Sequence, residues 1–259
     1  MDVLIFAGQS NMQGSTGEKC YEPKSERCFE YKYLTDKIVP LISPVGENIS
    51  ENVFCASAKG NGSLVPYFCR EYCKSGKKVL AIHVAKGDTA ISQWQKGTER
   101  FELLIKKVKA GINKAKDVIE NIYFIWLQGE SDALNFTGTE KYLKSLIKFK
   151  GDLKREIPIT RFAIIRQGYF CAYADWVKGT YKEKKSSDKA IMRAFNLAVK
   201  TDKDFIMLTK VCAKLSVNKK YLNGQEFGPH YNNKGMKIIG KKAAKQLLKQ
   251  EKVKKWKTN

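Results

Sequence analysis

Short apolar runs recur along the chain, and each is continuous rather than alternating between apolar and polar residues. The first run is Val3-Leu4-Ile5, and four others follow over residues 79–85, 122–127, 159–165 and 205–208. Continuous runs of this length are typical of parallel strands that helices cover on both faces. The pattern therefore predicts an α/β fold built around a parallel sheet of about five strands.

Amphipathic segments with helical spacing lie between and after these runs. Their apolar positions are Phe101, Leu104, Ile105, Val108 and Ile112; Tyr142, Leu146, Phe149 and Leu153; Ile191, Phe195, Ala198 and Val199; and Met236, Ile239, Ala243 and Leu247. Ser186, Ser187 and Asp188 are N-cap candidates for the third helix. Residues 15–61 are rich in Pro, Gly, Ser and Asn and are expected to form loops over the end of the first strand.

Length and composition indicate one large domain over residues 1–259, with a lysine-rich tail from about Lys249 that we expect to be solvated or frayed. No apolar run is long enough to span a bilayer, and the first strand begins almost at Met1, which leaves no room for a leader; we expect a cytoplasmic protein. The seven cysteines lack zinc-ligand spacing and are expected to be free thiols, with Cys69 and Cys73 on one face of a helix.

The formal net charge of +22 suggests binding to polyanions, because clustered lysines attract phosphate backbones. However, the lysines are spread over nearly every predicted helix, as at Lys106, Lys107 and Lys109, without the interleaved aromatic residues of a stacking platform. We therefore do not expect specific nucleic-acid binding.

The first strand leads directly into Gly8-Gln9-Ser10-Asn11-Met12. Ligands of open parallel sheets bind at the carboxyl ends of the strands, where backbone N–H groups can face a developing oxyanion. Ser10 is therefore a candidate nucleophile, although Gly-x-Ser also occurs in purely structural turns.

Two other strands also end in polar clusters. The first is Lys86-Gly87-Asp88-Thr89, in which Gly87 allows close approach of the backbone to a ligand. The second is Gln128-Gly129-Glu130-Ser131-Asp132. The Gln128 side chain can donate to an oxyanion, whereas Glu130 and Asp132 are either functional acids or helix caps.

The chain contains only two histidines, His83 and His230. His83 lies inside a predicted strand, which favours a hydrogen-bonded core imidazole. His230 lies in a turn-rich segment before the last helix, which suits a general base that is brought to the end of the sheet. The catalytic order along the chain would be serine, acid, histidine.

With these clusters in this order, nearly the whole chain resembles the SGNH hydrolase superfamily, in particular its sialate O-acetylesterase-like and carbohydrate esterase family 6-like branch. The segments that carry the resemblance are Gly8-Gln9-Ser10-Asn11-Met12, Ala85-Lys86-Gly87-Asp88-Thr89-Ala90-Ile91 with Trp94, Trp126-Leu127-Gln128-Gly129-Glu130-Ser131-Asp132, and His230-Tyr231-Asn232 with Gly235 and Gly240. The resemblance implies a flavodoxin-like three-layer α/β/α sandwich and a metal-free, cofactor-free serine esterase that removes acetyl groups from carbohydrates.

The resemblance further implies that Ser10 is the nucleophile and His230 the base. The implied oxyanion hole consists of the backbone N–H groups of Ser10 and Gly87 with the side chain of Gln128. Asn11 is expected to support the turn together with Gln9. These roles make an acetylated carbohydrate the expected partner.

The chain departs from its relatives at two places. Relatives often carry an aspartate two or three residues before the histidine, whereas this chain has Gly228 and Phe227 there. Glu130 is the first replacement to consider, followed by Glu226 and then Asp132. The other departure is Asp88, where relatives commonly have a glycine and where a negative charge would oppose an oxyanion.

These departures leave two alternatives open: a catalytically lapsed protein that binds carbohydrates or polyanions on the same fold, and an esterase with a lipid or thioester substrate. Four aromatic residues could stack on a sugar ring or belong to the core, namely Trp94, Trp126, Tyr169 and Trp176.

Overall fold

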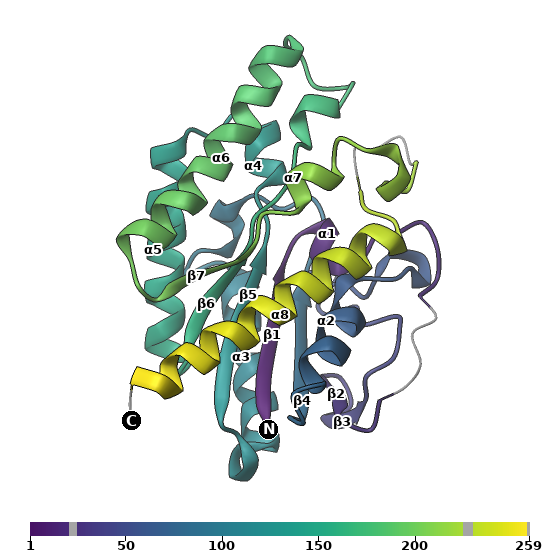
Figure 1. Cartoon of the computed structure of the whole chain (residues 1–259), viewed down its shortest axis with the longest axis vertical. Coiled ribbons are helices and arrows are strands. Elements are labelled where there is room, and N and C mark those ends of the chain that lie inside the picture. Colours follow the sequence, from purple (N-terminus) through teal and green to yellow (C-terminus); the bar gives the residue numbers. More distant parts are fainter. Residues whose placement is uncertain (21–24, 225–229, 258–259) are drawn as a thin grey trace.

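The computed structural model describes residues 1–20, 25–224 and 230–257, with side chains up to Glu251 except that of Lys59. Within these residues, seven strands form one sheet in the order β3-β2-β4-β1-β5-β6-β7 (Figure 1). Neighbouring strands are parallel, except that β3 is antiparallel to β2. The strands are β1 (Asp2–Gly8), β2 (Cys28–Lys32), β3 (Lys37–Pro40), β4 (Val79–Ala85), β5 (Asn121–Leu127), β6 (Arg161–Ile165) and β7 (Phe205–Thr209). The predicted α/β class and mostly parallel sheet are confirmed.

The two strands beyond the predicted five, β2 and β3, lie in the segment that we expected to form loops. β2 pairs with β4 over only three residues, starting at Cys28 opposite Val79. β3 is a four-residue edge strand with no buried residue. Short edge strands lack the continuous apolar run that marks a buried parallel strand, so their sequence pattern does not distinguish them from loops.

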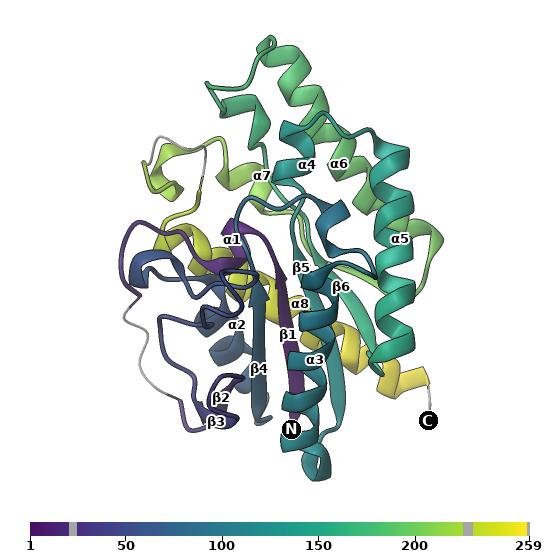
Figure 2. The same cartoon turned by 180° about the vertical axis from the view of Figure 1, so that it is seen from behind.

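Helices cover both faces of the sheet, as Figures 1 and 2 show from opposite sides. The helices are α1 (Ser10–Gln13), α2 (Leu64–Cys73), α3 (Glu99–Lys114), α4 (Glu130–Leu134), α5 (Thr139–Glu156), α6 (Tyr181–Thr201), α7 (Cys212–Leu215) and α8 (Asn233–Lys257). Short 3₁₀ turns are η1 (Ala58–Gly60), η2 (Ile91–Trp94), η3 (Lys116–Val118), η4 (Cys171–Tyr173) and η5 (Lys219–Tyr221). Successive β1 side chains alternate between faces: Val3 and Ile5 pack with α3, α5 and α6, whereas Leu4 and Phe6 pack with α2 and α8.

The ends of two helices differ from the prediction. α6 begins at Tyr181, because Thr180 and Glu183 form a reciprocal capping box. The predicted caps Ser186, Ser187 and Asp188 therefore lie inside this helix. The lysine-rich tail does not fray at residue 249, because α8 continues to Lys257.

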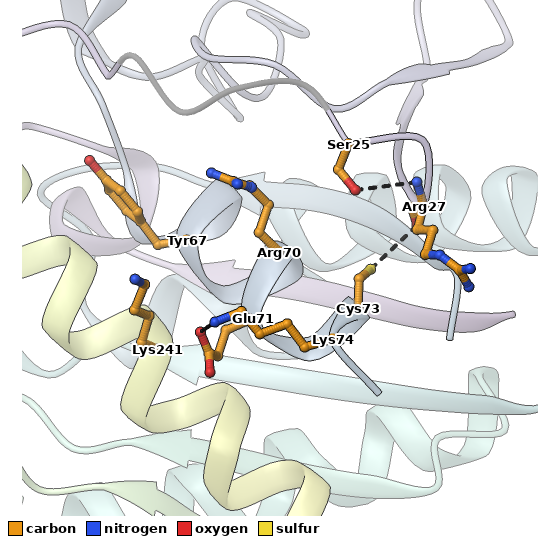
Figure 3. Close-up of a pocket in the computed structure, with 8 residues that line it drawn as sticks. All are labelled: Ser25, Arg27, Tyr67, Arg70, Glu71, Cys73, Lys74 and Lys241. Carbon is orange, nitrogen blue, oxygen red and sulfur yellow. Dashed lines mark hydrogen bonds and ion pairs between the residues drawn. The ribbon is translucent and has the colours of Figure 1, made fainter. Parts of the chain in front are cut away.

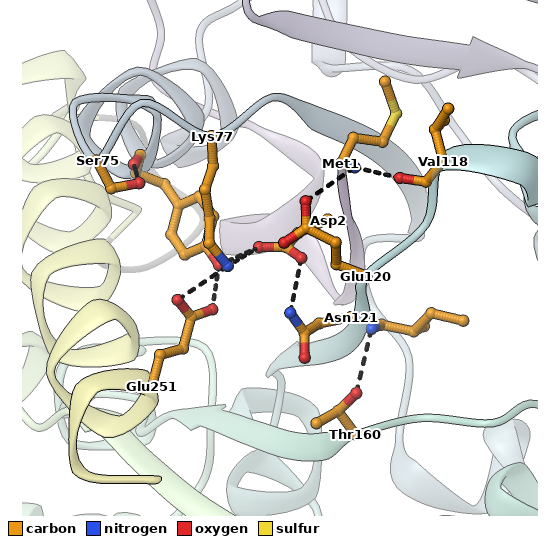
Figure 4. Close-up of polar contacts among 11 residues, drawn as sticks. Met1, Asp2, Ser75, Lys77, Val118, Glu120, Asn121, Thr160 and Glu251 are labelled. Atoms are coloured by element: carbon orange, nitrogen blue, oxygen red, sulfur yellow. Dashed lines mark hydrogen bonds and ion pairs between the residues drawn. The ribbon is translucent and has the colours of Figure 1, made fainter. Parts of the chain in front are cut away.

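A buried polar cluster joins four elements at the amino ends of the strands. The fully buried Asp2 carboxylate accepts hydrogen bonds from Tyr72 Oη (2.7 Å), Lys77 Nζ (2.6 Å) and Asn121 Nδ2 (2.9 Å) (Figure 4). Lys77 also pairs with Glu251 of α8 at 3.2 Å. These donors offset the desolvation of the carboxylate and tie α2, α8 and β5 to β1.

Candidate active site

The carboxyl ends of β1, β4 and β5 lie side by side, because Gly8 pairs with Ala85 on one side and with Leu127 on the other. The three polar clusters that follow these strands therefore meet at one edge of the sheet. Gly8 has a φ of +146°, and a Cβ atom on it would lie 1.9 Å from the carbonyl oxygen of Leu127. Only glycine fits this approach, which lets the chain turn directly into α1 and place Ser10 at its first position.

The structure brings Ser10 and His230 into contact although they are 220 positions apart in the sequence. His230 Nε2 lies 2.8 Å from Ser10 Oγ, and the imidazole is only 9% exposed. In the tautomer with its proton on Nδ1, the imidazole accepts a hydrogen bond from the hydroxyl and can remove its proton during attack. This arrangement provides a serine nucleophile with an adjacent base.

Neighbouring loops hold the His230 segment in place. The His230 carbonyl accepts a hydrogen bond from Asn223 N at 2.9 Å, and Asn223 Nδ2 donates to the carbonyl of Ser15 at 2.6 Å. The Phe170 ring packs edge-on against the imidazole, with centroids 5.4 Å apart. The segment is thus docked on the chain that follows α1, close to Ser10.

Asp188 shapes the loop that carries Phe170, a role that the sequence analysis missed. Its carboxylate is fully buried and accepts hydrogen bonds from the backbone N–H groups of Phe170 (3.1 Å), Cys171 (3.0 Å) and Ala172 (2.8 Å). Burial raises the pKa of Asp188 to about 6, although these three hydrogen bonds act in the opposite direction. The contact between a carboxylate inside a helix and the backbone of a preceding loop does not follow from the residues around Asp188 in the sequence.

The Glu130 side chain is buried, and Asn11 is its partner rather than His230. Asn11 Nδ2 donates to Glu130 Oε1 at 2.9 Å, and Asn11 Oδ1 accepts from the backbone N–H of Tyr231 at 3.4 Å. Glu130 Oε2 has no hydrogen-bond donor within the described part of the chain. The expected direct contact between Glu130 and the imidazole is therefore corrected: Glu130 reaches the histidine segment through Asn11. Burial raises the pKa of Glu130 to about 7.

Buried partners hold both ends of the Gln128 amide, so its predicted place in the oxyanion hole is also corrected. Its Nε2 donates to Asp132 Oδ2 (2.7 Å) and to the Thr89 carbonyl (2.8 Å). Its Oε1 accepts from Tyr142 Oη at 2.7 Å. An amide nitrogen has two hydrogens, and these contacts use both of them inside the core.

Asp132 and Gln9 likewise hold the strand ends together. Asp132 Oδ2 also accepts from the backbone N–H of Ile91 at 2.8 Å, which places this acid within the loop network rather than at His230. Gln9 Oε1 accepts from the backbone N–H groups of Gly129 (3.3 Å) and Ser131 (3.1 Å). Gln9 thus links the end of β1 to the segment that follows β5.

The Gly87 backbone lies beside the nucleophile. A Cβ atom on Gly87 would lie 3.4 Å from Ser10 Cβ, and its N–H donates to Gln13 Oε1 at 2.7 Å. Sequence reasoning missed Gln13; its position three residues after Ser10 in α1 was the available signal. Asp88 has a φ of +57° and is exposed, which explains a glycine preference and directs its charge toward solvent.

Two of the four candidate stacking residues belong to the core. Trp94 and Trp126 are fully buried and pack edge to face, with centroids 5.0 Å apart. Their indole N–H groups donate to Thr89 Oγ1 (3.1 Å) and Tyr142 Oη (3.4 Å). Neither ring is available to a substrate.

Of the other two candidates, Tyr169 is half-buried and Trp176 is exposed, and Tyr181 of α6 is a further exposed ring beside Tyr169's neighbour Lys185. Trp176 is 50% exposed and Tyr181 is 49% exposed. The Lys185 ammonium lies 5.5 Å from the ring centroid of Tyr169 and 5.0 Å from that of Tyr181. We call Tyr169, Tyr181 and Lys185 the cationic rim.

The remaining candidate residues have no described role in the site. His83 is buried in the sheet, its Nε2 lies 3.3 Å from the Met12 carbonyl, and burial lowers its pKa to about 3. The prediction of a core imidazole is confirmed. Glu226 lies outside the described residues, as do Phe227 and Gly228.

The family model for "carbohydrate esterase, sialic acid-specific acetylesterase" matches residues 1–249. The chain belongs to this family. The resemblance to the sialate O-acetylesterase-like branch is thereby confirmed, and family membership identifies the protein as a carbohydrate esterase, a carboxylic ester hydrolase.

Relatives of this esterase include a probable carbohydrate esterase of Arabidopsis thaliana, which is 28% identical over 221 residues, or 77% of this chain and 82% of the relative. Among solved structures, a protein of Arabidopsis thaliana is similar at a TM-score of 0.68 with 17% identity, covering 96% of this chain and 98% of the other. A carbohydrate acetylesterase from Xanthomonas citri reaches a TM-score of 0.53 with 13% identity, covering 95% of this chain and 55% of the other. These structures share the fold of the esterase.

The described residues contain neither a cluster of metal ligands nor a membrane-spanning helix. No group of three or more His, Cys, Asp or Glu side chains that could hold a metal ion occurs among them. None of the helices in that part of the esterase is both long and apolar enough to cross a bilayer.

Proposed function

We propose that this esterase removes O-acetyl groups from carbohydrates with Ser10 as nucleophile and His230 as general base. The observation that carries the proposal is the 2.8 Å separation between Ser10 Oγ and His230 Nε2 at the carboxyl edge of the sheet. A serine hydroxyl is a weak nucleophile at neutral pH, and an adjacent imidazole activates it. The contact supports the same pair of residues that the sequence motifs indicate.

The proposed reaction has two half-reactions. Ser10 Oγ attacks the acetyl carbonyl carbon while its proton moves to His230 Nε2, and a tetrahedral intermediate forms. The bond to the sugar oxygen then breaks, and the imidazolium gives its proton to that oxygen. Water, with His230 again as base, attacks acetyl-Ser10, which releases acetate and restores the hydroxyl.

Two backbone N–H groups, those of Ser10 and Gly87, are proposed to stabilise the oxyanion. Ser10 is the first residue of α1, so its N–H has no acceptor inside the helix. The Gly87 N–H donates to the neutral amide oxygen of Gln13, and the oxyanion would replace this oxygen as acceptor. A negatively charged acceptor forms the stronger hydrogen bond, which favours this exchange as charge develops.

Glu130 is proposed to be a positioning residue. Its carboxylate fixes the Asn11 amide, and Asn11 in turn accepts from the backbone next to His230. Because burial raises the pKa of Glu130 to about 7, its ionised form, which is the stronger acceptor, increases across the neutral range.

The ratio of wild-type to Glu130→Gln turnover is therefore expected to depend on pH. Glutamine resembles the protonated acid, so the two enzymes should agree within about threefold near pH 5.5 and differ by about 10- to 100-fold near pH 8.5, the cost of a misplaced catalytic group. Because wild type and Glu130→Gln share the titration of every other group, the ratio of their kcat values reports only the effect of Glu130. Glu226→Gln is the matched control, and its kcat near pH 8.5 should fall much less than that of Glu130→Gln. A constant ratio, or a larger loss in Glu226→Gln, would assign the orienting role elsewhere.

For the substrate, the cationic rim favours an acetylated acidic sugar, such as a sialic acid, over a neutral one such as acetylated xylose. Lys185, near the start of α6, places its ammonium close to two tyrosine rings, and one of these, Tyr169, directly precedes the Phe170 that packs on His230. An ammonium binds a carboxylate, and tyrosine rings pack on sugar faces.

Lys185→Met is expected to raise the KM for an O-acetylated sialic acid about tenfold or more, the usual cost of losing a hydrogen bond to a charged group. Hydrolysis of p-nitrophenyl acetate and of acetylated xylose should stay within about twofold of wild type, because neither substrate has a carboxylate. Steady-state kinetics on the three substrates measure this. Equal losses on all of them would contradict a carboxylate-specific role.

The serine mechanism itself is tested by covalent labelling. A fluorophosphonate should add once to the protein, at Ser10, and should abolish acetate release from p-nitrophenyl acetate and from an acetylated oligosaccharide. Ser92→Ala, which removes an exposed hydroxyl from η2, is the control and should label normally. Salt-sensitive binding of an acidic glycan without labelling or hydrolysis would support the lapsed binding protein instead.

A further inference from the structure

Two cysteines from different elements face each other at the edge of the sheet opposite the active site. Cys28 is the first residue of β2, and Cys73 is the last residue of α2. Their Sγ atoms are 3.2 Å apart although the residues are separated by 45 positions. Cys28 is paired with Val79 at the amino end of β4, so the hydrolytic site at the carboxyl ends uses neither thiol.

A pocket of about 320 Å³ reaches the Cys73 side of this thiol pair. Cys73 is one of its lining residues, and basic side chains surround it, including Arg27, Lys74 and Lys241 (Figure 3). Cys73 is 6% exposed, compared with 1% for Cys28. A small polar molecule can therefore approach the pair through the pocket, whereas a bulky reagent meets mostly buried sulfur.

The surroundings favour a thiolate on one sulfur and a thiol on the other. The hydrogen bond from Cys73, assisted by Ser25 and by the charge of Arg70, lowers the pKa of Cys28 to about 7. The pKa of Cys73 is raised, because it holds the shared proton beside the Cys28 sulfur. Cys69, one turn earlier in α2, is fully buried, and burial raises its pKa well above the usual value. The thiolate is the reactive form of cysteine, which distinguishes Cys28 from Cys69.

We infer that Cys28 and Cys73 form a redox modification site, at which hydrogen peroxide or a small alkyl hydroperoxide converts the two thiols to a disulfide. The Cys28 thiolate attacks the terminal peroxide oxygen, the O–O bond breaks, and water or an alcohol leaves after protonation. Cys73 Sγ then attacks the sulfenic acid at Cys28, forms the S–S bond and releases water with its proton. The two thiols lose two electrons, and the peroxide gains them.

The cross-link would act on stability rather than on catalysis. It joins the start of β2 to the end of α2 and restricts the unfolded chain between positions 28 and 73. We expect the oxidised protein to melt about 5–10 °C higher than the reduced one, given the usual effect of a loop of this length in a protein of this size. Esterase activity should remain within about twofold, because the hydrolytic site lies at the other end of the sheet.

The test is oxidation with hydrogen peroxide at neutral pH, followed by non-reducing peptide mapping and thermal unfolding. Wild type should lose two hydrogen atoms, yield one cross-linked peptide pair containing residues 28 and 73, and return to its original melting temperature with dithiothreitol. Cys28→Ser and Cys73→Ser should show neither the cross-link nor the shift. Cys55→Ser, which removes a thiol of similar exposure elsewhere, should behave as wild type.

Two results would overturn the inference. One is oxidation of Cys28 or Cys73 to stable oxyacids without a cross-link. The other is a cross-link that involves Cys69 in wild type. The melting temperatures of the reduced serine variants show whether each variant folds. A folded variant whose melting temperature does not rise on oxidation therefore lacks the cross-link.

Discussion

Replacing Ser10 by alanine is expected to lower kcat for acetyl ester hydrolysis by about 10⁴-fold or more, while KM changes by only a few fold. The reason is that Ser10 Oγ forms the covalent bond in the proposed reaction, and its hydroxyl is the group that lies 2.8 Å from His230 Nε2. Alanine replaces the hydroxymethyl group of Ser10 by a methyl group at the first position of α1, which leaves the packing intact. Initial rates with p-nitrophenyl acetate and an acetylated oligosaccharide measure the effect.

His230→Ala should cause a loss of similar size, and the double variant should lose little more. Groups that act as a unit are not additive, because either one alone depends on the other. Thermal unfolding of each variant is the control for folding. Undiminished turnover in Ser10→Ala would remove Ser10 from the mechanism, and additive losses would mean that the two residues act separately.

Replacing Asp188 by alanine is expected to reduce the free energy of unfolding by about 3–5 kcal/mol. The fully buried carboxylate accepts three backbone N–H groups, those of Phe170, Cys171 and Ala172, and alanine would leave all three without that acceptor. The loop that holds Phe170 against His230 should also lose its position, so kcat should fall. Urea unfolding and steady-state kinetics measure the two effects.

Asp188→Asn is the matched variant, because it keeps one acceptor oxygen and nearly the same volume. Asp188→Asn should lose less free energy of unfolding than Asp188→Ala. Its stability should also depend less on pH between about 4 and 6 than that of wild type. In that range the folded wild type, with a pKa of about 6 at Asp188, binds more protons than the unfolded chain, so wild-type stability falls as pH rises. Equal stability of Asp188→Ala and wild type would show that the loop does not need the carboxylate.

The strand ends of the site were predictable because local pattern determines where a buried strand stops. Gly8, Gly87 and Gln128 follow continuous apolar runs, and parallel strands align such ends at one edge. The direction of each polar side chain was not predictable in this way. Gln128 carries the right donor group but turns to Asp132 and Thr89, since buried donors take the nearest acceptors in the core.

The same limit applies to the residues that sequence reasoning missed. Gln13 is relevant only because α1 places it against the Gly87 backbone, which comes from a different strand end. Asp188 looked like a helix cap because its neighbours are serines, yet the capping box at Thr180 starts the helix two turns earlier. Which of several candidate residues becomes the helix cap depends on where the preceding loop lies, and that position is set by the tertiary structure.

The sequence by itself determined the layers, the order of the strands along the chain and the pairing of a serine near one end with a histidine near the other, because apolar periodicity and strand-end motifs are local. Tertiary structure alone decided that Glu130 reaches the histidine segment through Asn11, that β2 and β3 extend the sheet, and that Cys28 meets Cys73. These outcomes depend on distances between residues far apart in the chain, and such distances are set only when the whole core packs.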